Sequence, residues 1–207
     1  MELFTNGFGL SAVVFFPLIS AFVITLIPKA QEQLIKRFAL ASSLITFVLS
    51  AILLFQFDFS SAEKLQLGNK ISWIKSINAN YEIGIDGISL PLLVLSTFIT
   101  VLAIIYSLEH LPEPKSPKGF LALILVLETG MNGTFVALDL ILFFVFFEIV
   151  LLPMYFMIGI WGDKTVRTVS GFKNQIETRL YASIKFFVFT LFGSAFMLLG
   201  FLGLYYR

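Results

Sequence analysis

Six long apolar stretches constrain the fold of this chain more than any other feature. Each is close to the roughly 20 residues that an α-helix needs to cross a membrane. Lipid offers no partner for an open backbone amide, so such spans are expected to be helical. The sequence therefore predicts an all-α, polytopic membrane helix bundle with about six transmembrane helices, forming a single transmembrane domain over residues 1–207. The predicted spans are residues 9–28, 38–57, 88–108, 119–137, 140–161 and 182–204.

Composition supports a lipid environment for the chain. Hydrophobic residues make up 58% of the sequence and charged residues 13%, about half the charge of an ordinary soluble domain. The formal net charge is +1 and there is no basic tract, so no nucleic-acid partner is expected. The lipid bilayer is the expected surrounding of the helices.

Cysteine and histidine usage limits the cofactors that the chain can hold. The sequence contains no cysteine and one histidine, which excludes disulfides, Cys-ligated iron–sulfur clusters and a bis-His haem. No Walker motif, dinucleotide fingerprint or catalytic triad is present. We therefore expect neither a cofactor nor a metal site in this chain.

The connections between the spans are short, with one exception. Spans four and five are separated by a few residues around Asp139, and we expect a tight turn because one helix through both would be about twice as long as a bilayer is thick. Residues 58–87 are the least hydrophobic part and are expected to form an external loop, with Trp73 and Tyr81 packed onto neighbours. The first span lacks a basic n-region and a cleavage site, so it is expected to be retained.

Basic residues predict the orientation of the chain in the membrane. Loops after spans one, three and five hold nine Lys and Arg residues, whereas the other side holds four. The positive-inside rule then places the N-terminus outside and the odd-numbered loops in the cytoplasm. The nine are Lys29, Lys36, Arg37, Lys115, Lys118, Lys164, Arg167, Lys173 and Arg179, and the four are Lys64, Lys70, Lys75 and Arg207.

Glu148 is the most informative ionisable residue within a span. It lies near the middle of the fifth span, where an ionised side chain costs at least about 2.5–3.5 kcal/mol on insertion scales. Burial there favours the neutral acid, and Pro153 removes the helical hydrogen bond to the Ile149 carbonyl. A carboxyl in this setting can load and release a proton. The alternative is a protonated glutamate that is hydrogen-bonded inside the bundle for packing alone.

Glu128 and Lys185 are two further candidates for a proton relay. Glu128 lies in the fourth span and shares a helix face with Asn132, either as a second proton site or as part of a polar seam between helices. Lys185 lies one turn into the sixth span, where it can serve a relay or extend to the lipid headgroups. An acid and a base on adjacent helices would form a minimal relay if they lie close together.

Three stretches of the sequence resemble a known family in order and spacing. The stretches are GIDGISLPLLVL at 84–95, GTFVALDLILFFVFFEIVLLPMYFMIGIWGD at 133–163 and YASIKFFVFT at 181–190. The family that they resemble is the antiporter-like subunit M, or chain 4, of NADH:quinone oxidoreductase (respiratory complex I). The aspartate in LD and the spacing in FFEIVLLP make the second stretch the most specific.

The resemblance implies a function for the chain. It implies a membrane-arm subunit without a redox cofactor of its own, which takes part in proton translocation coupled to quinone reduction. NADH and quinone would be used elsewhere in the complex, and the partners would be other membrane subunits of complex I. The family's essential glutamate falls on Glu148, while Glu128 and Lys185 lie where relatives can carry polar or charged groups. The expected location is the bacterial inner (plasma) membrane, with the N-terminus external.

The chain departs from the family in length. Family members have about fourteen spans in two inverted repeats, and transporters of this kind place their sites between repeats. With about six spans, the chain is expected to be an N-terminal portion, truncated or split, with no independent activity. Open alternatives are a subunit of an Mrp-type cation/proton antiporter or of a membrane-bound hydrogenase, and a non-transporting membrane scaffold.

Overall fold

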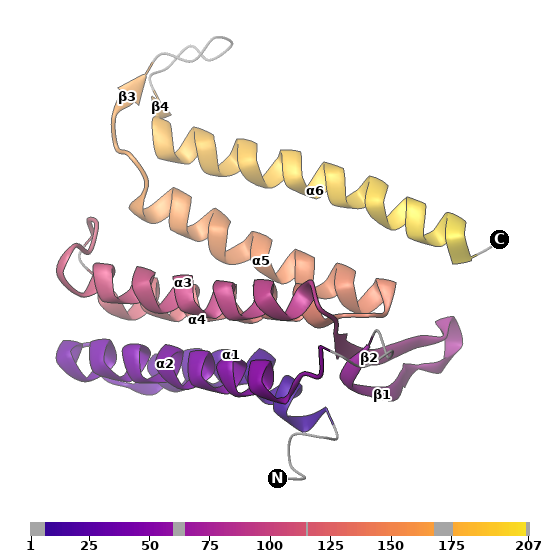
Figure 1. The fold of residues 1–207 in the computed structure, drawn as a ribbon. Coiled ribbons are helices and arrows are strands. Elements are labelled where there is room, and N and C mark those ends of the chain that lie inside the picture. Colours follow the sequence, from indigo (N-terminus) through magenta and orange to yellow (C-terminus); the bar gives the residue numbers. More distant parts are fainter. Residues whose placement is uncertain (1–6, 60–64, 115, 168–175, 206–207) are drawn as a thin grey trace.

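The computed structural model of the chain describes residues 7–59, 65–114, 116–167 and 176–205. This part contains six helices that are long and apolar enough to cross a membrane. They confirm the predicted helical membrane fold, and the chain is a multi-pass membrane protein. The helices are α1 (Phe8–Leu26), α2 (Glu32–Gln56), α3 (Ser89–Glu109), α4 (Pro117–Val136), α5 (Leu140–Trp161) and α6 (Thr178–Tyr205) (Figure 1).

Two helices begin a full turn or more before their predicted spans. Helix α2 begins at Glu32 rather than at residue 38, and α6 begins at Thr178 rather than at residue 182. The added turns carry charged side chains such as Arg37 and Arg179, which hydropathy excludes from a span. Charged residues still form helix at the end of a span, where their head groups can reach water.

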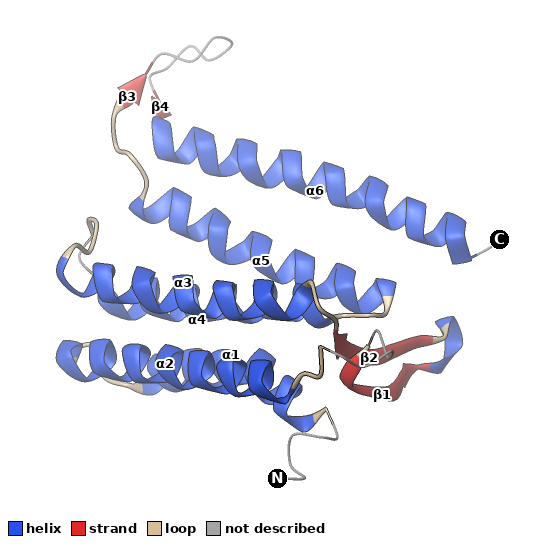
Figure 2. Ribbon diagram, viewed as in Figure 1, coloured by secondary structure: helices blue, strands red, loops and turns tan. Residues whose placement is uncertain are grey.

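The segment predicted as an external loop contains a β-hairpin. Strand β1 (Gln66–Ile74) pairs antiparallel with β2 (Ala79–Ile85), and the short 3-10 helix η2 (Lys75–Ile77) lies between them (Figure 2). A second, two-residue pair joins β3 (Val166–Arg167) to β4 (Ile176–Glu177). The prediction missed the hairpin because its polar and apolar residues do not alternate cleanly along β1.

Of the two residues of this segment that were predicted to pack onto neighbours, Tyr81 does so. Tyr81 lies within hydrogen-bond distance of Ser11, with 2.9 Å between the hydroxyl oxygens, and its ring centroid is 6.2 Å from that of Phe15. Burial raises the pKa of the Tyr81 phenol. Trp73, in contrast, is 50% exposed, so the prediction that it packs onto neighbours is wrong.

The helices form successive layers. Helices α1 and α2 pack beneath α3 and α4, α5 packs on α4, and α6 packs mainly on α5 (Figure 1). The β-hairpin lies at one end of the bundle, which we call the hairpin end. The connections from α1 to α2 and from α3 to α4 lie at the other, which we call the loop end. Of the residues of α6, two serines are buried, Ser183 and Ser194.

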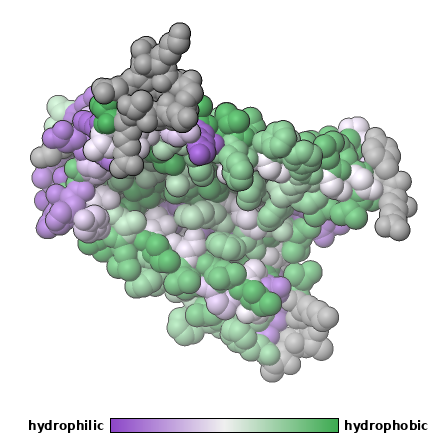
Figure 3. Space-filling view, turned by 90° about the horizontal axis from the view of Figure 1, so that it is seen from above, coloured by the Kyte–Doolittle hydropathy of each residue, from purple (hydrophilic) through white to green (hydrophobic). Residues whose placement is uncertain are grey.

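The surface has the distribution expected of a membrane protein. Hydrophobic residues cover most of the face in Figure 3, and hydrophilic residues gather toward the loop end. Large exposed apolar side chains include Phe189, Phe192 and Phe196 on α6. Such a surface is stable in lipid and would be unfavourable in water.

Basic side chains at the loop end donate hydrogen bonds to carbonyl groups at the ends of neighbouring helices. The Nζ of Lys36 donates to the Leu108 carbonyl at 2.8 Å, and that of Lys118 donates to the Ile27 carbonyl at 2.7 Å. A third bond runs from Arg179 Nη1 to the carbonyl of Ile160 at 2.6 Å. The last carbonyls of a helix lack backbone partners, and a cation there also offsets the negative end of the helix dipole. Of the basic residues that predicted the orientation, Lys64, Lys115, Lys173 and Arg207 lie outside the described residues.

Candidate functional site

Asp139 fixes the start of helix α5. Its Oδ1 atom accepts hydrogen bonds from the backbone N–H groups of Ile141 at 2.8 Å and Leu142 at 3.1 Å. Its Oδ2 atom accepts one from the backbone N–H of Asn80 in β2, at 2.9 Å. The same carboxylate is therefore the N-cap of α5 and the link between that helix and the β-hairpin.

Two glycines bring helices α4 and α5 into close contact. A Cβ atom placed on Gly133 would lie 2.1 Å from the Phe146 ring, and one on Gly130 would lie 2.7 Å from a methyl group of Val150. Small residues of this kind allow backbones to approach closely in membrane bundles. Phe146 and Val150 thus define the face of α5 that packs on α4.

Glu148 lies on the opposite face of α5, toward α6. At about 100° per residue, a position two residues from Phe146 lies on the far side of the helix. Glu148 shares its face with Tyr155 and Gly159, both of which contact α6. The Tyr155 and Phe187 ring centroids are 5.3 Å apart, and a Cβ atom on Gly159 would lie 3.3 Å from the Ser183 hydroxyl oxygen.

The register of α5 and α6 places Glu148 level with Ser194. The two helices are antiparallel, and Tyr155 meets Phe187. Glu148 lies seven residues before Tyr155, and Ser194 lies seven residues after Phe187. Ser194 is 3% exposed and donates its hydroxyl to the Leu191 carbonyl of its own helix at 3.0 Å.

The Glu148 carboxyl is poorly satisfied by the described residues. Its side chain is half-buried, and Oε1 is buried without a hydrogen-bond partner among them. Pro153 lies inside α5 and lacks an N–H, so the Ile149 carbonyl has no backbone donor at that position. The site therefore combines an unpaired acid with a local break in the helical hydrogen-bond ladder.

Lys185 does not lie near Glu148. It lies midway between Ser183, which faces Gly159, and Phe187, which faces Tyr155. It is thus level with residue 157, and at 1.5 Å per residue this is roughly 13–14 Å from Glu148 along the helix. Lys185 is exposed, and its Nζ lies 5.6 Å from the Tyr181 ring centroid. The structure does not bring the two together as a direct acid–base pair.

Glu128 is fully buried between other helices. It is 0% exposed, and neither carboxylate oxygen has a hydrogen-bond partner among the described residues. Asn132, one turn further along α4, donates from Nδ2 to the backbone carbonyl of Val13 in α1 at 3.3 Å. Asn132 thus belongs to the contact between α1 and α4, and Glu128 lies one turn away on the same face of α4. Both are separate from the α6-facing side of α5 that holds Glu148.

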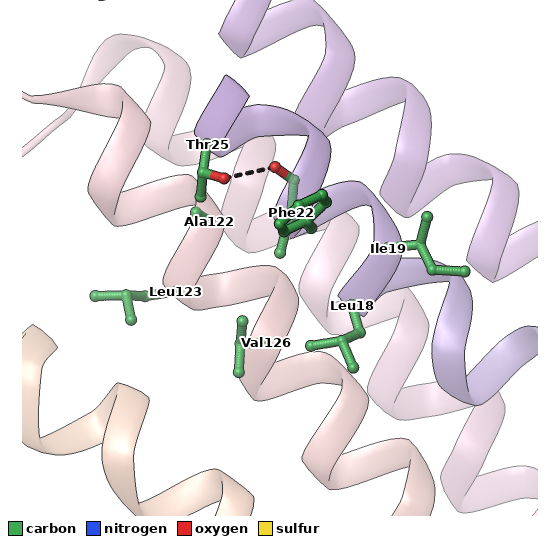
Figure 4. Close-up of a pocket in the computed structure, with 8 residues that line it drawn as sticks. Leu18, Ile19, Phe22, Thr25, Ala122, Leu123 and Val126 are labelled. Carbon is green, nitrogen blue, oxygen red and sulfur yellow. Dashed lines mark hydrogen bonds between the residues drawn. The ribbon is translucent and has the colours of Figure 1, made fainter. Parts of the chain in front are cut away.

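The outer side of the α1–α4 contact carries an apolar groove. Its volume is about 570 Å³, and Figure 4 shows its lining side chains on the two helices. Thr25 supplies the hydroxyl there, and it donates to the Phe22 carbonyl at 2.6 Å. Without an acid or base in its lining, the groove offers no chemistry to a proton path.

Sequence reasoning missed three features of these sites. Asp139 could have been found as an N-cap, because it directly precedes an apolar run. Pro17, inside the first span, signals an unpaired carbonyl four residues earlier. The position of Ser194 opposite Glu148 carries no sequence signal, because the register of two helices depends on their packing.

Comparisons with known proteins agree with this architecture. Residues 13–134 match the family described as NADH-ubiquinone oxidoreductase chain 4, amino terminus. Residues 137–207 match the family described as NADH:quinone oxidoreductase/Mrp antiporter, TM. The two matches cover most of the chain.

Similar proteins include subunits of respiratory complexes. The chain is 36% identical over 195 residues to NADH-ubiquinone oxidoreductase chain 4 of Arabidopsis thaliana, covering 94% of the chain and 36% of that protein. It is 39% identical over 203 residues to the chain 4 protein of Mycosarcoma maydis, with 96% and 38% coverage. For NADH-quinone oxidoreductase subunit M of Rickettsia bellii the identity is 36% over 201 residues, with 95% and 37% coverage.

A solved structure shares the fold. It is that of the membrane-bound sulfane sulfur reductase, an archaeal respiratory membrane complex, with a TM-score of 0.67 and 21% identity, covering 92% of this chain and 36% of that one. The chain spans little more than a third of the length of these relatives. On the match to residues 13–134, it belongs to the NADH-ubiquinone oxidoreductase chain 4 (subunit M) family, of which it contains the amino-terminal portion.

Proposed function

We propose that the chain is a membrane-arm subunit of NADH:quinone oxidoreductase and takes part in proton translocation coupled to quinone reduction, with Glu148 as the proton-carrying group. The observation that carries the proposal is the setting of Glu148. Its carboxyl lies midway along an apolar helix, on the face toward α6, with Oε1 buried and unpaired among the described residues. An ionisable group in such a place is expensive to retain unless it has a function.

The proposed chemistry is a change in the protonation state of one carboxyl. Burial favours the neutral acid, and an approaching cation would favour the carboxylate. No cation forms an ion pair with Glu148 in the described part of the chain. The gating charge is therefore proposed to come from elsewhere in the assembly. Moving one charge against a membrane potential requires about 2.3 kcal/mol per 100 mV, so redox energy must drive the cycle.

The other assignments follow from the same proposal. The chain would hold no redox cofactor or metal, and NADH and quinone would react in other subunits. Its partners would be further membrane subunits of the complex. The proposed location is a bacterial inner membrane with the hairpin end outside, because most basic residues lie toward the loop end. Lys185, exposed near the loop end, is proposed to act in proton entry rather than as the direct partner of Glu148.

A substitution that removes the titratable group tests the proposal. In the assembled complex, Glu148→Gln should strongly lower proton pumping and quinone-linked NADH oxidation while leaving assembly intact. Glu113→Gln is a matched control, since Glu113 is an exposed glutamate whose carboxylate lies 3.7 Å from Lys164 Nζ. Pumping by Glu148→Gln at the rate of the control would refute the role of Glu148.

A subunit of an Mrp-type antiporter is a second candidate, because the model that matches residues 137–207 describes both kinds of complex. The two candidates differ in what drives proton movement. A complex I subunit should copurify with NADH-oxidising activity, whereas an antiporter subunit should support cation-dependent proton exchange without NADH. Genes for complex I subunits beside this gene would favour the first.

A further inference from the structure

Helix α1 packs on helix α4 and contains a proline. Pro17 lies inside α1, and the helix continues past it to Leu26. Because proline has no N–H, the carbonyl of Val13, four residues earlier, lacks its helical donor. Lipid supplies no replacement for such a donor, so a carbonyl at this depth needs a partner from the protein.

Asn132 of α4 supplies that partner. Its Nδ2 atom donates to the Val13 carbonyl at 3.3 Å, and both residues are fully buried. The acceptor atom of the carboxamide, Oδ1, is buried without a hydrogen-bond partner among the described residues. The Asn132 amide nitrogen is thus bound to α1, whereas its amide oxygen is free to accept a hydrogen bond.

Glu128 lies at the same site. Two contacts set the antiparallel register of the helices: Asn132 to Val13, and Lys118 to the carbonyl of Ile27. A step of four residues from Asn132 to Glu128 therefore matches the step of four from Val13 to Pro17. Glu128 is level with the proline and lies on the same face of α4 as Asn132, one turn away.

No charged group of the described residues is placed to neutralise a Glu128 carboxylate. Helix α1 contains no ionisable side chain. Those of the other neighbouring elements lie near the ends of the bundle, apart from two residues of α5, Glu148 and Tyr155, that face α6. The end groups are Lys118 of α4, Glu32, Lys36 and Arg37 of α2, Tyr106 and Glu109 of α3, and Tyr81 and Glu82 of β2.

A buried carboxyl without a counter-charge is stable as the neutral acid, which has one O–H to donate. We propose that Glu128 is a proton-binding site in which the neutral carboxyl donates to Asn132 Oδ1 while Asn132 Nδ2 donates to the Val13 carbonyl. The occupied site is then a hydrogen-bonded chain from α4 to α1, ending on the carbonyl that Pro17 leaves free.

Loss of the proton would break this chain. A carboxylate has no donor and requires one, and the nearest on its own helix face is the Asn132 amide group. Turning that amide toward Glu128 would withdraw it from Val13 and leave the carbonyl unpaired. The packing of α1 on α4 would thus depend on whether Glu128 holds its proton. This dependence does not require proton transfer at Glu148.

A double-variant experiment tests the link to Val13 in the full chain within its membrane assembly. Asn132→Leu should lower the temperature at which the assembly unfolds, because the Val13 carbonyl loses its donor. Pro17→Ala restores a backbone N–H to that carbonyl, so the double variant should recover at least half of the loss measured against Pro17→Ala alone. An equal loss in both backgrounds would refute the link. If Asn132→Leu does not assemble, recovery of assembly by Pro17→Ala becomes the readout.

Thr129→Val is the matched control for the double variant. Thr129 is also fully buried on α4, but its hydroxyl donates to the Leu125 carbonyl of its own helix at 3.2 Å. Any effect of Thr129→Val should be the same with and without Pro17→Ala. Recovery of this variant by Pro17→Ala would mean that the alanine stabilises α1 in general, which contradicts the proposal.

Infrared spectroscopy tests the proton itself. The difference between the spectra of the natural chain and Glu128→Gln should contain the carbonyl band of a protonated carboxyl at neutral pH. In Asn132→Leu that band should move to higher frequency, because the O–H loses its acceptor. A carboxylate band in place of the acid band would overturn the proposal. Neither readout measures pumping, so this outcome is distinct from a failure of Glu148.

Discussion

The Asp139 carboxylate accepts a hydrogen bond from the backbone N–H of Asn80, with 2.9 Å between Oδ2 and the nitrogen. Since Oδ1 of the same group caps α5, one side chain joins the helix that carries Glu148 to the β-hairpin. A further backbone bond, from the Leu138 N–H to the Glu82 carbonyl at 2.9 Å, runs beside it. The start of α5 is therefore held from two sides.

Removal of this carboxylate should destabilise the hairpin end. Asp139→Ala loses the cap and is expected to lower the free energy of unfolding by about 1–2 kcal/mol. Asp139→Asn keeps one acceptor oxygen, so its loss should be smaller. Thermal unfolding of the lipid-reconstituted assembly measures both. Equal stability of the alanine variant and the natural chain would contradict the double role of Asp139.

Ser194 should support proton translocation at Glu148. A hydroxyl level with the carboxyl can turn from the Leu191 carbonyl to donate to a Glu148 carboxylate, which would favour the charged form. We expect Ser194→Ala to lower the rate of proton translocation, because a Glu148 carboxylate would then lose this donor. Ser183→Ala is the control, since Ser183 is also buried on this face but faces Gly159. An unchanged rate in Ser194→Ala would remove Ser194 from the site.

Glycine positions on two helices should differ sharply in their tolerance of alanine. Gly133→Ala places a Cβ atom 2.1 Å from the Phe146 ring, which forces α4 and α5 apart. The expected loss in stability is about 1–3 kcal/mol. A Cβ atom on Gly193 would meet none of the described residues within 4 Å apart from its own stretch of helix, so Gly193→Ala should leave the stability unchanged. Unfolding temperatures of the two variants compare them directly, and similar values would contradict the close packing at Gly133.

Asp86 should make the start of α3 sensitive to acid. Hydrogen bonds from the backbone N–H groups of Ser89 at 2.7 Å and Ile88 at 2.9 Å hold the pKa of Asp86 below its ordinary value of 3.8. A lowered pKa means that the carboxylate stabilises the folded chain above pH 3.8, and that this contribution is lost as the pH falls through the lower, folded value. Unfolding temperatures measured over falling pH should drop less steeply for Asp86→Asn. An identical slope in both would contradict the assignment.

Hydropathy predicted the fold well because each span needs apolar side chains over the whole thickness of the lipid core. The same requirement explains the missed elements. Residues 32–37 are helical although Glu32, Lys36 and Arg37 are charged, and the hairpin around Tyr81 lies beyond the apolar stretches. Neither produces a membrane signal.

The sequence predicted the candidate site residues, but not where they lie relative to one another. Glu148 and Glu128 stand out because each is an acid in an apolar run. Their separation onto opposite sides of the α4–α5 pair follows from the contacts of Gly130 and Gly133 with α5, which no single helix specifies. The distance between Glu148 and Lys185 likewise depends on the register of α5 and α6.

The basic residues of the loop end connect insertion with folding. Lys36, Lys118 and Arg179 belong to the basic residues from which the orientation in the bilayer is predicted, and each also binds a carbonyl at the end of another helix. A chain inserted in the reverse orientation would have to move these three charged side chains across the lipid. If they did not reach their positions, the carbonyls at the ends of α1, α3 and α5 would lose these donors. The same three basic side chains would therefore favour both the predicted orientation and the packing of the helix ends.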